Sequence, residues 1–357
     1  MVRPRLLVAF GGASSEHEIS LRSACSVLAA VDHERFEPVP LGIARDGSWH
    51  TGSLDERPTP DQLAALIAGG EAVADLRTLG IDLVFPVLHG PYGEDGTIQG
   101  MLEILGLPYV GSGVLASALC MDKVAQKHLV ASAAPEVPLV PWREVDDLTI
   151  ADERGLARVI EELRDTLGLP CFVKPVNLGS SVGVVRVDRV DALGDALRSA
   201  ARYDHRVVIE KGIDAREIEI AVLGNGGPQT QLSEPGEIEL PAGTWYDYDT
   251  KYVNDVAVLH VPAPLPEETV EGIRASALRA FQVTGCKGLA RIDFLLCRRT
   301  GTAYLNELNT MPGFTSISMY PRMMAHAGVS YRELVSRLCD LGLEHHHVRR
   351  QLSNERS

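Results

Sequence analysis

Residues 306–314 read NELNTMPGF, and their polar side chains recur at a spacing that suits one face of a strand. Successive side chains of a strand point to opposite faces, so Glu307 and Asn309 share a face that Leu305 and Leu308 cannot both occupy. The Met-Pro-Gly sequence at residues 311–313 then ends the strand. An acid and an amide on one face predict that a polar partner lies opposite them.

Residues 289–309, LARIDFLLCRRTGTAYLNELN, predict two antiparallel strands joined by a turn around residues 298–301. Arg291 and Asp293 share one face of the first strand. If Cys297 lies opposite Ala303, the same register places Asp293 opposite Glu307.

Aspartate, glutamate and asparagine offer only hard oxygen ligands to a cation. Asp293, Glu307 and Asn309 are too few for a complete protein cage. They suit a Mg²⁺ ion that keeps water ligands and takes the rest from phosphates, so the pattern points to a magnesium nucleotide. Taken alone, the segment fits equally well a solvated sheet face balanced by Arg291.

The chain has 357 residues, of which 45% are hydrophobic, and this length suits two or three compact domains. Its net charge of -14 argues against nucleic acid or an anionic membrane surface as the main partner. The apolar run at residues 6–10 is too short for a signal-peptide core, and no stretch is long enough to span a bilayer. We therefore expect a cytoplasmic enzyme.

The cysteines are scattered, without a CxxC pair, and most have apolar neighbours, so we expect reduced core thiols and assign them no chemistry. They are Cys25, Cys120, Cys171, Cys286, Cys297 and Cys339.

Residues 1–111 predict an N-terminal α/β domain. Residues 5–10 form a buried strand in this interpretation, followed by the loop GGASSE and a helix to about residue 30. VPLGIA at 39–44 and IDLVFPVL at 81–88 give further strands, and this alternation is typical of α/β folds.

Two further domains are expected. Residues 112–213 form a smaller α+β unit with strands CFVKP, VGVVRV and RVVIE, entered through the proline-rich APEVPLVP. Residues 214–345 contain the strand EIEIAVLG, a helix near 267–284, the hairpin and a long polar loop at 233–256. The polar tail is placed at 346–357. The chain after Leu343 includes three successive histidines, and from Glu344 onward we expect solvated, disordered chain rather than a metal site.

VKPVNLGSSVGV, residues 173–184, places Lys174 at the end of an apolar strand, ahead of a glycine-serine loop. Gly179, Ser180, Ser181 and Gly183 can leave backbone N–H groups available for phosphate oxygens. The spacing fits neither a Walker P-loop nor a dinucleotide-binding GxGxxG motif. Such a loop alone is more often a turn, and the preceding lysine favours phosphate binding.

VVIEKGIDAREIEI, residues 207–220, carries Glu210 at a strand end and Glu217 shortly after it. The glycine-containing hinge between them can offer backbone groups to an adenine ring. On this pattern alone, salt-bridged surface acids are the stronger alternative.

With VKPVNLGSSVGV, ARIDF and NELNTMPGF in this order, the sequence resembles the ATP-grasp enzymes, and specifically the D-alanine:D-alanine ligase family. The resemblance covers nearly the whole chain. It includes GGASSEHEIS at 11–20, LHGPYGEDGTIQG at 88–100, GSGVLASALCMDK at 111–123, YDYDTKY at 246–252 and NTMPGFTSISMYP at 309–321.

The resemblance implies a three-domain ATP-grasp fold, α/β and α+β, with an N-terminal Rossmann-like domain. It implies that ATP phosphorylates the carboxylate of one D-alanine and that the amine of a second D-alanine attacks the acyl phosphate. It further implies two Mg²⁺ ions, for which Mn²⁺ can substitute, a monovalent cation, a homodimer and a role in peptidoglycan synthesis.

The resemblance also assigns the reacting centre. Asp293, Glu307 and Asn309 match the ligands of the two metal ions. Arg291, with the backbone N–H of Gly313, matches the group that stabilises the acyl phosphate and the tetrahedral intermediate.

The nucleotide contacts follow from the same matches. Lysines grip the phosphates, an acid accepts the ribose hydroxyl, and Glu210 with the backbone after it meets the adenine. Lys251 meets the γ-phosphate as the 233–256 loop closes and excludes water. The full set is Lys123, Lys174, Ser180, Ser181, Glu210, Lys211, Ile213, Glu217, Trp245, Lys251, Asn306 and Glu307.

Glu16 matches the residue that binds the ammonium group of the first D-alanine, and His89 is placed to meet its carboxylate. An acid in the first turn of a helix often serves the helix dipole instead. Here Ser15 and Glu18 predict an S-x-x-E capping box, which leaves Glu16 available for the substrate.

Tyr252, Ser180 and Glu16 match a hydrogen-bonded trio that ties the closing loop to the N-terminal domain. Ser318 and the backbone N–H of Met319 match the seat of the second carboxylate. The YDYDTKY sequence favours an amine acceptor over D-lactate.

Three alternatives remain at this point: a D-alanine:D-lactate or D-alanine:D-serine ligase, a non-catalytic nucleotide-binding ATP-grasp protein, and a dehydrogenase. A non-catalytic relative would be expected to have lost Arg291, Asp293, Glu307 or Asn309, and all four are present. The glycine spacing after the first strand does not suit a dehydrogenase.

Overall fold

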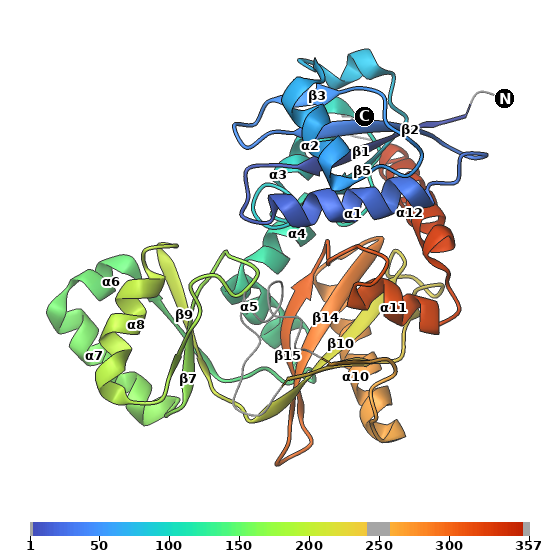
Figure 1. Cartoon of the computed structure of the whole chain (residues 1–357). Coiled ribbons are helices and arrows are strands. Elements are labelled where there is room, and N and C mark those ends of the chain that lie inside the picture. The colour runs from blue at the N-terminus through green and yellow to red at the C-terminus, as the bar shows by residue number, and fades with distance from the viewer. Residues whose placement is uncertain (1–2, 241–257, 353–357) are drawn as a thin grey trace.

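The computed structural model describes residues 3–240 and 258–352. The described chain forms three separate sheets with helices packed against them (Figure 1). One sheet lies within residues 5–87, one within 142–211 and one within 215–309. Each sheet falls inside one of the three domains expected from the sequence.

The N-terminal sheet has the strand order β4-β3-β2-β1-β5. Strand β1 pairs in parallel with β2 and β5, and the short strands β3 and β4 add antiparallel pairing at the other edge. The apolar run after Pro4 makes β1 a buried strand, as predicted. The elements are β1 (Arg5–Gly11), α1 (His17–Ala30), β2 (Glu37–Ile43), β3 (Trp49–Thr51), α2 (Pro60–Gly69), β4 (Glu71–Ala72), η1 (Leu76–Leu79), β5 (Leu83–Val87) and α3 (Thr97–Leu105).

The central unit is an antiparallel sheet of order β6-β9-β7-β8 with helices α7 and α8 packed against it (Figure 1). Alternating side chains of β7 and the buried run of β9 supply the apolar face. The elements are β6 (Trp142–Asp146), α6 (Asp147–Ala151), α7 (Glu153–Thr166), β7 (Cys171–Pro175), β8 (Val185–Val187), η2 (Val190–Ala192), α8 (Leu193–Ala200) and β9 (Arg206–Lys211).

The third sheet has the order β13-β12-β10-β14-β15, with β11 paired to β10. Its long central strands are antiparallel, and the predicted hairpin forms β14 and β15. The elements are β10 (Ala215–Leu223), β11 (Gln231–Leu232), β12 (Gly236–Glu239), β13 (Val258–His260), α10 (Glu267–Val283), β14 (Leu289–Cys297), β15 (Ala303–Asn309), α11 (Met319–His326) and α12 (Tyr331–Arg350).

Two helices connect the N-terminal unit with the central one: α4 (Val114–Met121) and α5 (Lys123–Ala133). Asp122 caps α5 by accepting hydrogen bonds from the N–H groups of Val124 and Ala125. Val124 packs against the central sheet, whereas Val130 belongs to the core beneath the third sheet. Helix α5 therefore packs against both the central sheet and the third sheet.

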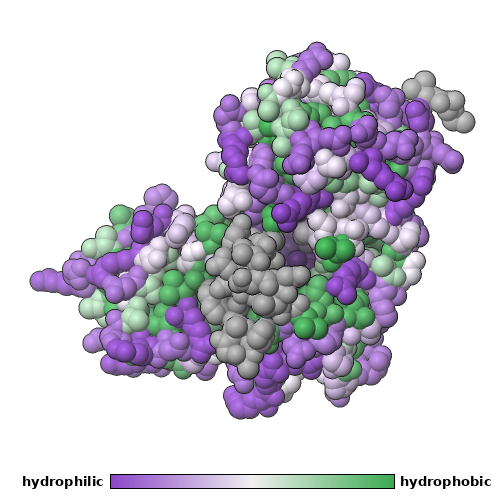
Figure 2. Space-filling view, viewed as in Figure 1, coloured by the Kyte–Doolittle hydropathy of each residue, from purple (hydrophilic) through white to green (hydrophobic). Residues whose placement is uncertain are grey.

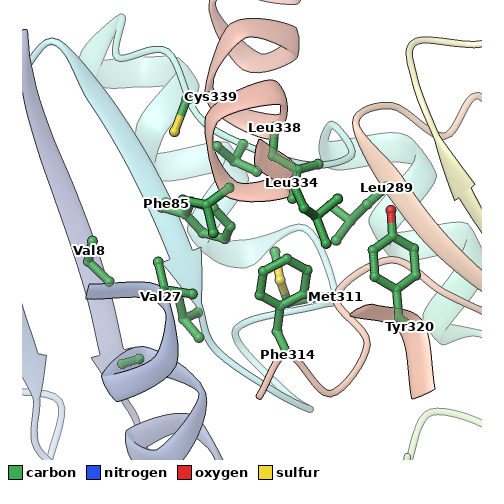
Figure 3. Packing of buried hydrophobic residues seen from close by; sticks show 14 of the residues in the cluster. Val8, Val27, Phe85, Leu289, Met311, Phe314, Tyr320, Leu334, Leu338 and Cys339 are labelled. Atoms are coloured by element: carbon green, nitrogen blue, oxygen red, sulfur yellow. The ribbon is translucent and has the colours of Figure 1, made fainter. Parts of the chain in front are cut away.

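A shared hydrophobic core joins the N-terminal sheet to the third sheet. Figure 3 shows Phe85 of β5 beside Phe314 and Met311, with Leu334 and Leu338 of α12 completing the cluster. The rings of Phe85 and Phe314 have centroids 5.8 Å apart. Apolar contact thus holds the segment after β15 against the N-terminal unit.

Helix α12 corrects one expectation from the sequence. The chain from Glu344 was expected to be disordered, but the helix continues to Arg350. Its apolar side packs beside α1 in the shared core, and Arg349 pairs with Glu103 at 2.6 Å. The polar composition of this segment was misleading. The segment continues α12, whose earlier residues are already packed in the core, and a helix that has formed is easily extended.

Polar side chains cover most of the visible surface of the molecule (Figure 2). Within the described ranges, every helix is too short or too polar to cross a bilayer.

Candidate active site

One face of the third sheet carries a row of acids. Glu219 of β10 lies opposite Asp293 of β14, which lies opposite Glu307 of β15. Next to this row, Arg291 lies opposite Asn309. The other face packs against α10 and forms a separate apolar core. The polar face is therefore free to serve chemistry, as the spacing of Glu307 and Asn309 indicated.

A β-bulge in β15 produces this arrangement. The register shifts between Asp293 and Phe294, so Phe294 pairs with Leu305, Asp293 pairs with Glu307, and Asn306 is the extra residue. Leu305 and Leu308 both reach the α10 core because of the bulge. Strict alternation would have placed these two leucines on opposite faces.

The bulge also corrects the predicted register. Cys297 was expected opposite Ala303, but Ala303 pairs with Leu296. The prediction that Asp293 faces Glu307 is nevertheless confirmed, since the extra residue restores that pairing. The bulge sets Asn306 beside Glu307 at the edge of the site, where the sequence placed both among the nucleotide contacts.

Arg291 and Asp293 form a two-pronged ion pair. Arg291 Nε donates to Asp293 Oδ1 at 2.8 Å, and Arg291 Nη2 donates to Oδ2 at 2.7 Å. Asn309 Nδ2 also donates to Asp293 Oδ2, at 2.9 Å. Burial opposes the charge on Arg291, but Asp293 and Glu219 outweigh it and raise the pKa of the guanidinium.

The charge balance of this face suits a divalent cation. Glu219, Asp293 and Glu307 bring three carboxylates beside the single guanidinium of Arg291, and Glu219 and Asp293 are buried. Excess negative charge in such a place is costly unless cations share it. No cluster of His, Cys, Asp and Glu in the described ranges is arranged to hold a metal by itself. The oxygen donors therefore fit a Mg²⁺ ion that also takes phosphate and water ligands.

A second charged cluster lies in the central unit. Lys174 of β7 contacts Glu210 Oε2 of β9 at 2.5 Å, and Lys127 of α5 contacts Glu210 Oε1 at 2.8 Å. Lys127 and Glu210 are almost fully buried. Burial alone would raise the pKa of Glu210, but the two ammonium groups hold it well below its usual range.

The glycine-serine loop follows Lys174 between β7 and β8. Ser180, Ser181 and Gly183 have φ angles of 52°, 57° and 74°. The loop forms turns, with the N–H groups of Val182 and Val184 donating to Gly179 O and Ser181 O, and turns of this kind can direct other backbone N–H groups toward an anion. Lys123, the first residue of α5, donates from Nζ to the carbonyl of Leu178 in this loop. The structure thus brings Lys123, Lys174 and the loop together.

The hinge after Glu210 has part of its backbone already engaged. The N–H of Lys211 donates to Pro141 O at 2.9 Å, and the N–H of Gly212 donates to Pro170 O at 2.8 Å. An adenine at this hinge would therefore have to form its hydrogen bonds with other groups, such as the backbone of Ile213. Glu217 lies farther along the chain, on the same face of β10 as Glu219. Trp245, Lys251 and Tyr252 lie outside the described residues.

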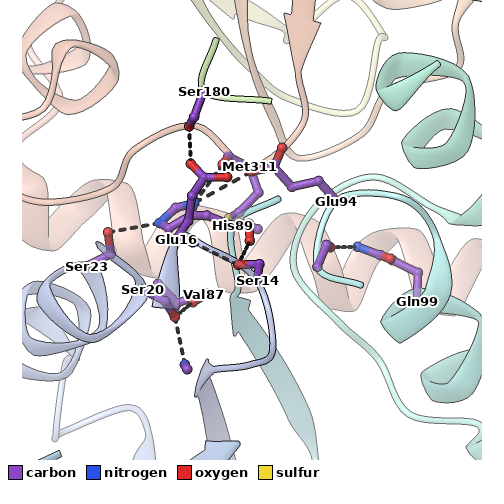
Figure 4. Close-up of polar contacts among 12 residues, drawn as sticks. Ser14, Glu16, Ser20, Ser23, Val87, His89, Glu94, Gln99, Ser180 and Met311 are labelled. Atoms are coloured by element: carbon purple, nitrogen blue, oxygen red, sulfur yellow. Dashed lines mark hydrogen bonds and ion pairs between the residues drawn. The ribbon is translucent and has the colours of Figure 1, made fainter. Parts of the chain in front are cut away.

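Glu16 lies between the N-terminal unit and the loop of the central unit (Figure 4). Ser180 Oγ donates to Glu16 Oε1 at 2.5 Å, and the N–H of Glu16 donates to Ser14 Oγ at 3.2 Å. The predicted capping box is wrong, because α1 begins at His17 with Glu16 as its N-cap and no side chain caps it. Glu18 instead faces Arg45 at 3.4 Å. The carboxylate of Glu16 nevertheless points to the central loop.

His89 is buried beside Glu16 (Figure 4). Its Nε2 lies 3.0 Å from Ser23 Oγ, and its Nδ1 lies 3.1 Å from the carbonyl of Met311 and 3.6 Å from Glu94 Oε1. Burial opposes protonation of His89, but the hydrogen bond and charge of Glu94 outweigh it and raise the pKa of the imidazole. Met311 and Glu94 thus flank Nδ1 of this buried imidazole, and Ser23 flanks Nε2.

The segment after β15 forms a further polar corner. Ser318 is the N-cap of α11, and its Oγ lies 2.7 Å from Thr315 Oγ1 and accepts from the N–H of Thr315 at 3.2 Å. The Met319 side chain is buried, so the first residue of this helix contributes its backbone to the corner. A helix N-terminus of this kind favours a carboxylate. Gly313 is near, since a Cβ there would lie 3.4 Å from Ser318 Oγ.

Four buried or partly buried residues of these clusters were missed from the sequence: Ser23, Glu94, Lys127 and Glu219. Two had a readable signal. Glu219 follows Glu217 at strand spacing, and Lys127 follows Lys123 at the spacing of one helix face. The contacts of Ser23 and Glu94 with His89 depend on how the N-terminal unit folds, which local spacing does not reveal.

Comparison with known proteins agrees with this geometry. A family model described as "D-ala D-ala ligase N-terminus" matches residues 5–112, and one described as "D-ala D-ala ligase C-terminus" matches residues 132–340. The chain is 46% identical to a D-alanine--D-alanine ligase of Deinococcus radiodurans, over 96% of this chain and 99% of that protein. It is 44% identical to one of Heliobacterium modesticaldum, over 100% of this chain and 99% of that protein.

Solved structures give the same picture. The VanG D-Ala:D-Ser ligase from Enterococcus faecalis superposes with a TM-score of 0.83 at 32% identity, covering 96% of this chain and 100% of that chain. The D-alanine-D-alanine ligase from Coxiella burnetii superposes with a TM-score of 0.81 at 32% identity, covering 98% and 96% of the two chains. These likenesses confirm the fold expected from the sequence.

Proposed function

The chain belongs to the D-alanine–D-alanine ligase family and is a ligase of D-alanine, and we propose that it joins two D-alanine molecules with ATP through a D-alanyl phosphate. The observation that carries the proposal is the polar face of the third sheet. Asp293 lies opposite Glu307 there, Arg291 lies opposite Asn309, and the phosphate-binding lysines lie on the neighbouring central unit. We assign the dipeptide product to peptidoglycan synthesis.

Each unit has a role in this proposal. The N-terminal domain, residues 1–111, binds the first D-alanine. The central domain, residues 112–213, holds the phosphates and one side of the adenine, and the C-terminal domain, residues 214–345, supplies the metal ligands and the closing loop at 233–256. The 2.5 Å contact between Ser180 and Glu16 supports this division, because it joins the phosphate loop to the proposed D-alanine site.

In the first step, a carboxylate oxygen of the first D-alanine attacks the γ-phosphorus of ATP, and ADP leaves. Glu16 holds the ammonium group of this D-alanine, and His89 faces its carboxylate side. Lys123, Lys174 and the backbone of Ser180 and Ser181 hold the phosphates in line. Glu217 accepts from the ribose, and the adenine lies beside Glu210, Lys211 and Ile213.

Asp293, Glu307 and Asn309 are the proposed ligands of Mg²⁺. When bound, Mg²⁺ neutralises the charge that develops on the transferred phosphoryl group. Arg291 lies beside these ligands and stabilises the acyl phosphate.

In the second step, the free amine of the second D-alanine attacks the acyl carbon and phosphate leaves. The Arg291 guanidinium and the N–H of Gly313 stabilise the negative oxygen of the tetrahedral intermediate. Ser318 and the N–H of Met319 seat the carboxylate of the acceptor. Tyr252, Lys251 and Trp245 belong to the same proposal as parts of the closing loop.

Further parts of the proposal rest on the family alone. These are a homodimer, a cytoplasmic location, a second Mg²⁺ ion, replacement of Mg²⁺ by Mn²⁺, and a monovalent cation that assists nucleotide binding. Size-exclusion chromatography with light scattering tests the dimer, and replacing K⁺ by Na⁺ in the assay tests the monovalent cation.

A second candidate is a ligase that selects D-serine as acceptor. The likeness to a D-Ala:D-Ser ligase structure supports considering it. The two activities differ only in the acceptor, so the reacting centre described above would serve both. The corner around Ser318 is where they would be distinguished.

ADP release with Mg-ATP and D-alanine, with products resolved by mass, tests the proposal. The comparison reactions contain L-alanine, or D-alanine with D-serine or D-lactate. We expect D-alanyl-D-alanine as the main product and no dipeptide from L-alanine. Preferential formation of the mixed product would favour the second candidate. Nucleotide binding without D-alanine-dependent ADP release would contradict both.

A further inference from the structure

Glu219 is a buried acid in the reacting centre to which the mechanism above gives no role. It lies in the middle of β10, opposite Asp293, and its side chain is 5% exposed. Leu223 and Ala221 of the same strand face are packed in the shared apolar core. An ionised carboxylate is costly in such surroundings unless a cation accompanies it.

Arg291 provides that cation and is shared between two acids. Its Nε lies 3.1 Å from Glu219 Oε2 and 2.8 Å from Asp293 Oδ1. Its Nη2 takes the other oxygen of Asp293, at 2.7 Å. Both oxygens of Asp293, a proposed metal ligand, are therefore engaged by the guanidinium.

A metal ion at Asp293 and the guanidinium compete for the same oxygens. A divalent cation requires at least one of these oxygens to turn toward it, which weakens the hold of Asp293 on Arg291. The guanidinium must nevertheless stay in the site to stabilise the acyl phosphate. While the metal is bound to Asp293, Arg291 needs a second acidic partner. Glu219 already lies 3.1 Å from its Nε.

We propose that Glu219 is a positioning residue that retains the Arg291 guanidinium while Asp293 binds the metal. This inference rests on the proposed function, because it assumes a magnesium nucleotide at Asp293. Glu219 itself touches neither substrate nor metal in this account. Its effect on metal binding is exerted through Arg291.

The variant Glu219→Gln tests this role, with binding of Mn²⁺ in the presence of ADP followed by the electron paramagnetic resonance signal of free Mn²⁺. The amide keeps the shape of the side chain but loses the charge, so Arg291 stays on Asp293 and competes with the metal. We expect Mn²⁺ to bind about tenfold more weakly, which is the scale of one close charge pair. Glu219→Asp keeps the charge and should recover most of the affinity.

A double-variant cycle separates this role from simple attraction between Glu219 and the metal. With Arg291→Met there is no guanidinium to retain, so adding Glu219→Gln should leave Mn²⁺ affinity unchanged. A direct charge effect would instead weaken binding by the same factor in both backgrounds, and that result would overturn the proposal. Unchanged affinity in Glu219→Gln alone would overturn it as well.

Glu237→Gln is the matched control. Glu237 is also a buried acid of this sheet paired with an arginine, Arg216 at 2.7 Å, but that pair lies on the strand face opposite to Glu219. We expect its Mn²⁺ affinity to equal that of the unmodified protein. Failure of the unmodified protein to bind Mn²⁺ with ADP would instead count against the proposed function, so the two failures are distinguishable.

Steady-state kinetics gives a second readout. Loss of a positioning contact for Arg291 should lower kcat for Glu219→Gln at saturating Mg²⁺ by about tenfold. The KM for the first D-alanine should stay within a factor of about two, since Glu16 and His89 are untouched. A change confined to KM would contradict the role.

Discussion

Ser180 and Glu16 are 164 positions apart in the chain, yet Ser180 Oγ donates a hydrogen bond to Glu16 Oε1 at 2.5 Å. Ser180 belongs to the loop between β7 and β8, and Glu16 precedes α1. This contact joins the central and N-terminal units directly over the proposed site of the first D-alanine. It couples the phosphate loop to the residue that we expect to hold the substrate ammonium group.

Ser180→Ala should uncouple ATP use from ligation. Without the hydroxyl, the loop loses its tie to Glu16, and water gains access to the acyl phosphate. We expect the ratio of ADP to dipeptide to rise about severalfold above one, while ATP binding changes little. Parallel assays of ADP and dipeptide measure this ratio. Ser48→Ala, at an exposed hairpin serine, should keep the ratio near one, and an unchanged ratio in Ser180→Ala would refute the role.

Glu307→Gln should abolish turnover and leave the fold intact. The amide has nearly the volume of the acid but removes one negative charge from the row formed with Asp293 and Glu219. We expect kcat to fall by about a thousandfold or more, because the proposed Mg²⁺ loses a charged ligand. Circular dichroism and the thermal midpoint check the fold. Near-normal turnover of a folded variant would exclude Glu307 as a metal ligand.

Glu210 should make stability depend on pH in the acid range. Its folded pKa lies below the value of about 4.3 for an unfolded glutamate, so its contribution is complete above that value. The contribution is lost as the pH falls from there toward the folded pKa. Glu210→Gln leaves Lys127 and Lys174 without their shared carboxylate, and we expect a loss of about 3 kcal/mol near neutral pH.

The difference between Glu210→Gln and the unmodified protein should therefore shrink on acidification. Urea unfolding at about pH 7, 4 and 3, with a probe in the central unit, measures it, because the contribution falls only below the unfolded pKa of about 4.3. Glu161→Gln, at an exposed helix position, should change the free energy of unfolding by less than about 0.5 kcal/mol at each pH. A difference that stays constant with pH would show that the carboxylate of Glu210 is not held ionised by the lysines.

Much of the fold was predictable because its main strands are long apolar runs bounded by glycine and proline. The buried strand β1, the hairpin β14–β15 and the pairing of Asp293 with Glu307 were all readable in this way. The pairing of Cys297 with Ala303, from which the register was predicted, was wrong. A period-two pattern does not reveal the bulge at Asn306. The bulge allows Leu305 and Leu308 to be buried together in the core beneath the sheet, and this depends on tertiary packing.

The sequence was less informative about polar contacts between residues that lie far apart along the chain. Ser23 and Glu94 contact His89 only after the N-terminal unit folds, and Lys127 reaches Glu210 only when α5 packs on the central sheet. Helix α1 also begins one residue later than the capping pattern indicated, because tertiary contacts hold Glu16. In each case long-range packing decides the partner. The spacing of Lys123 and Lys127 indicates a shared helix face but does not identify Glu210 as the partner of Lys127.

Ser318→Ala should weaken the acceptor site selectively. The Ser318 hydroxyl bonds to Thr315 and not to the turn of α11 that follows, so it remains near the helix N-terminus that we propose for the second carboxylate. We expect the KM for the second D-alanine to rise about tenfold, with the first site within about twofold.

Initial rates over a wide range of D-alanine concentration separate the two sites. Ser330→Ala is the matched control, because Ser330 is also a helix N-cap, but its hydroxyl accepts from the N–H of Glu333 in α12. That change should lower the free energy of unfolding by about 1 kcal/mol without altering either KM. Equal effects of the two substitutions on the acceptor KM would mean that the hydroxyl of Ser318 serves the helix alone, and the carboxylate seat would then have to lie elsewhere.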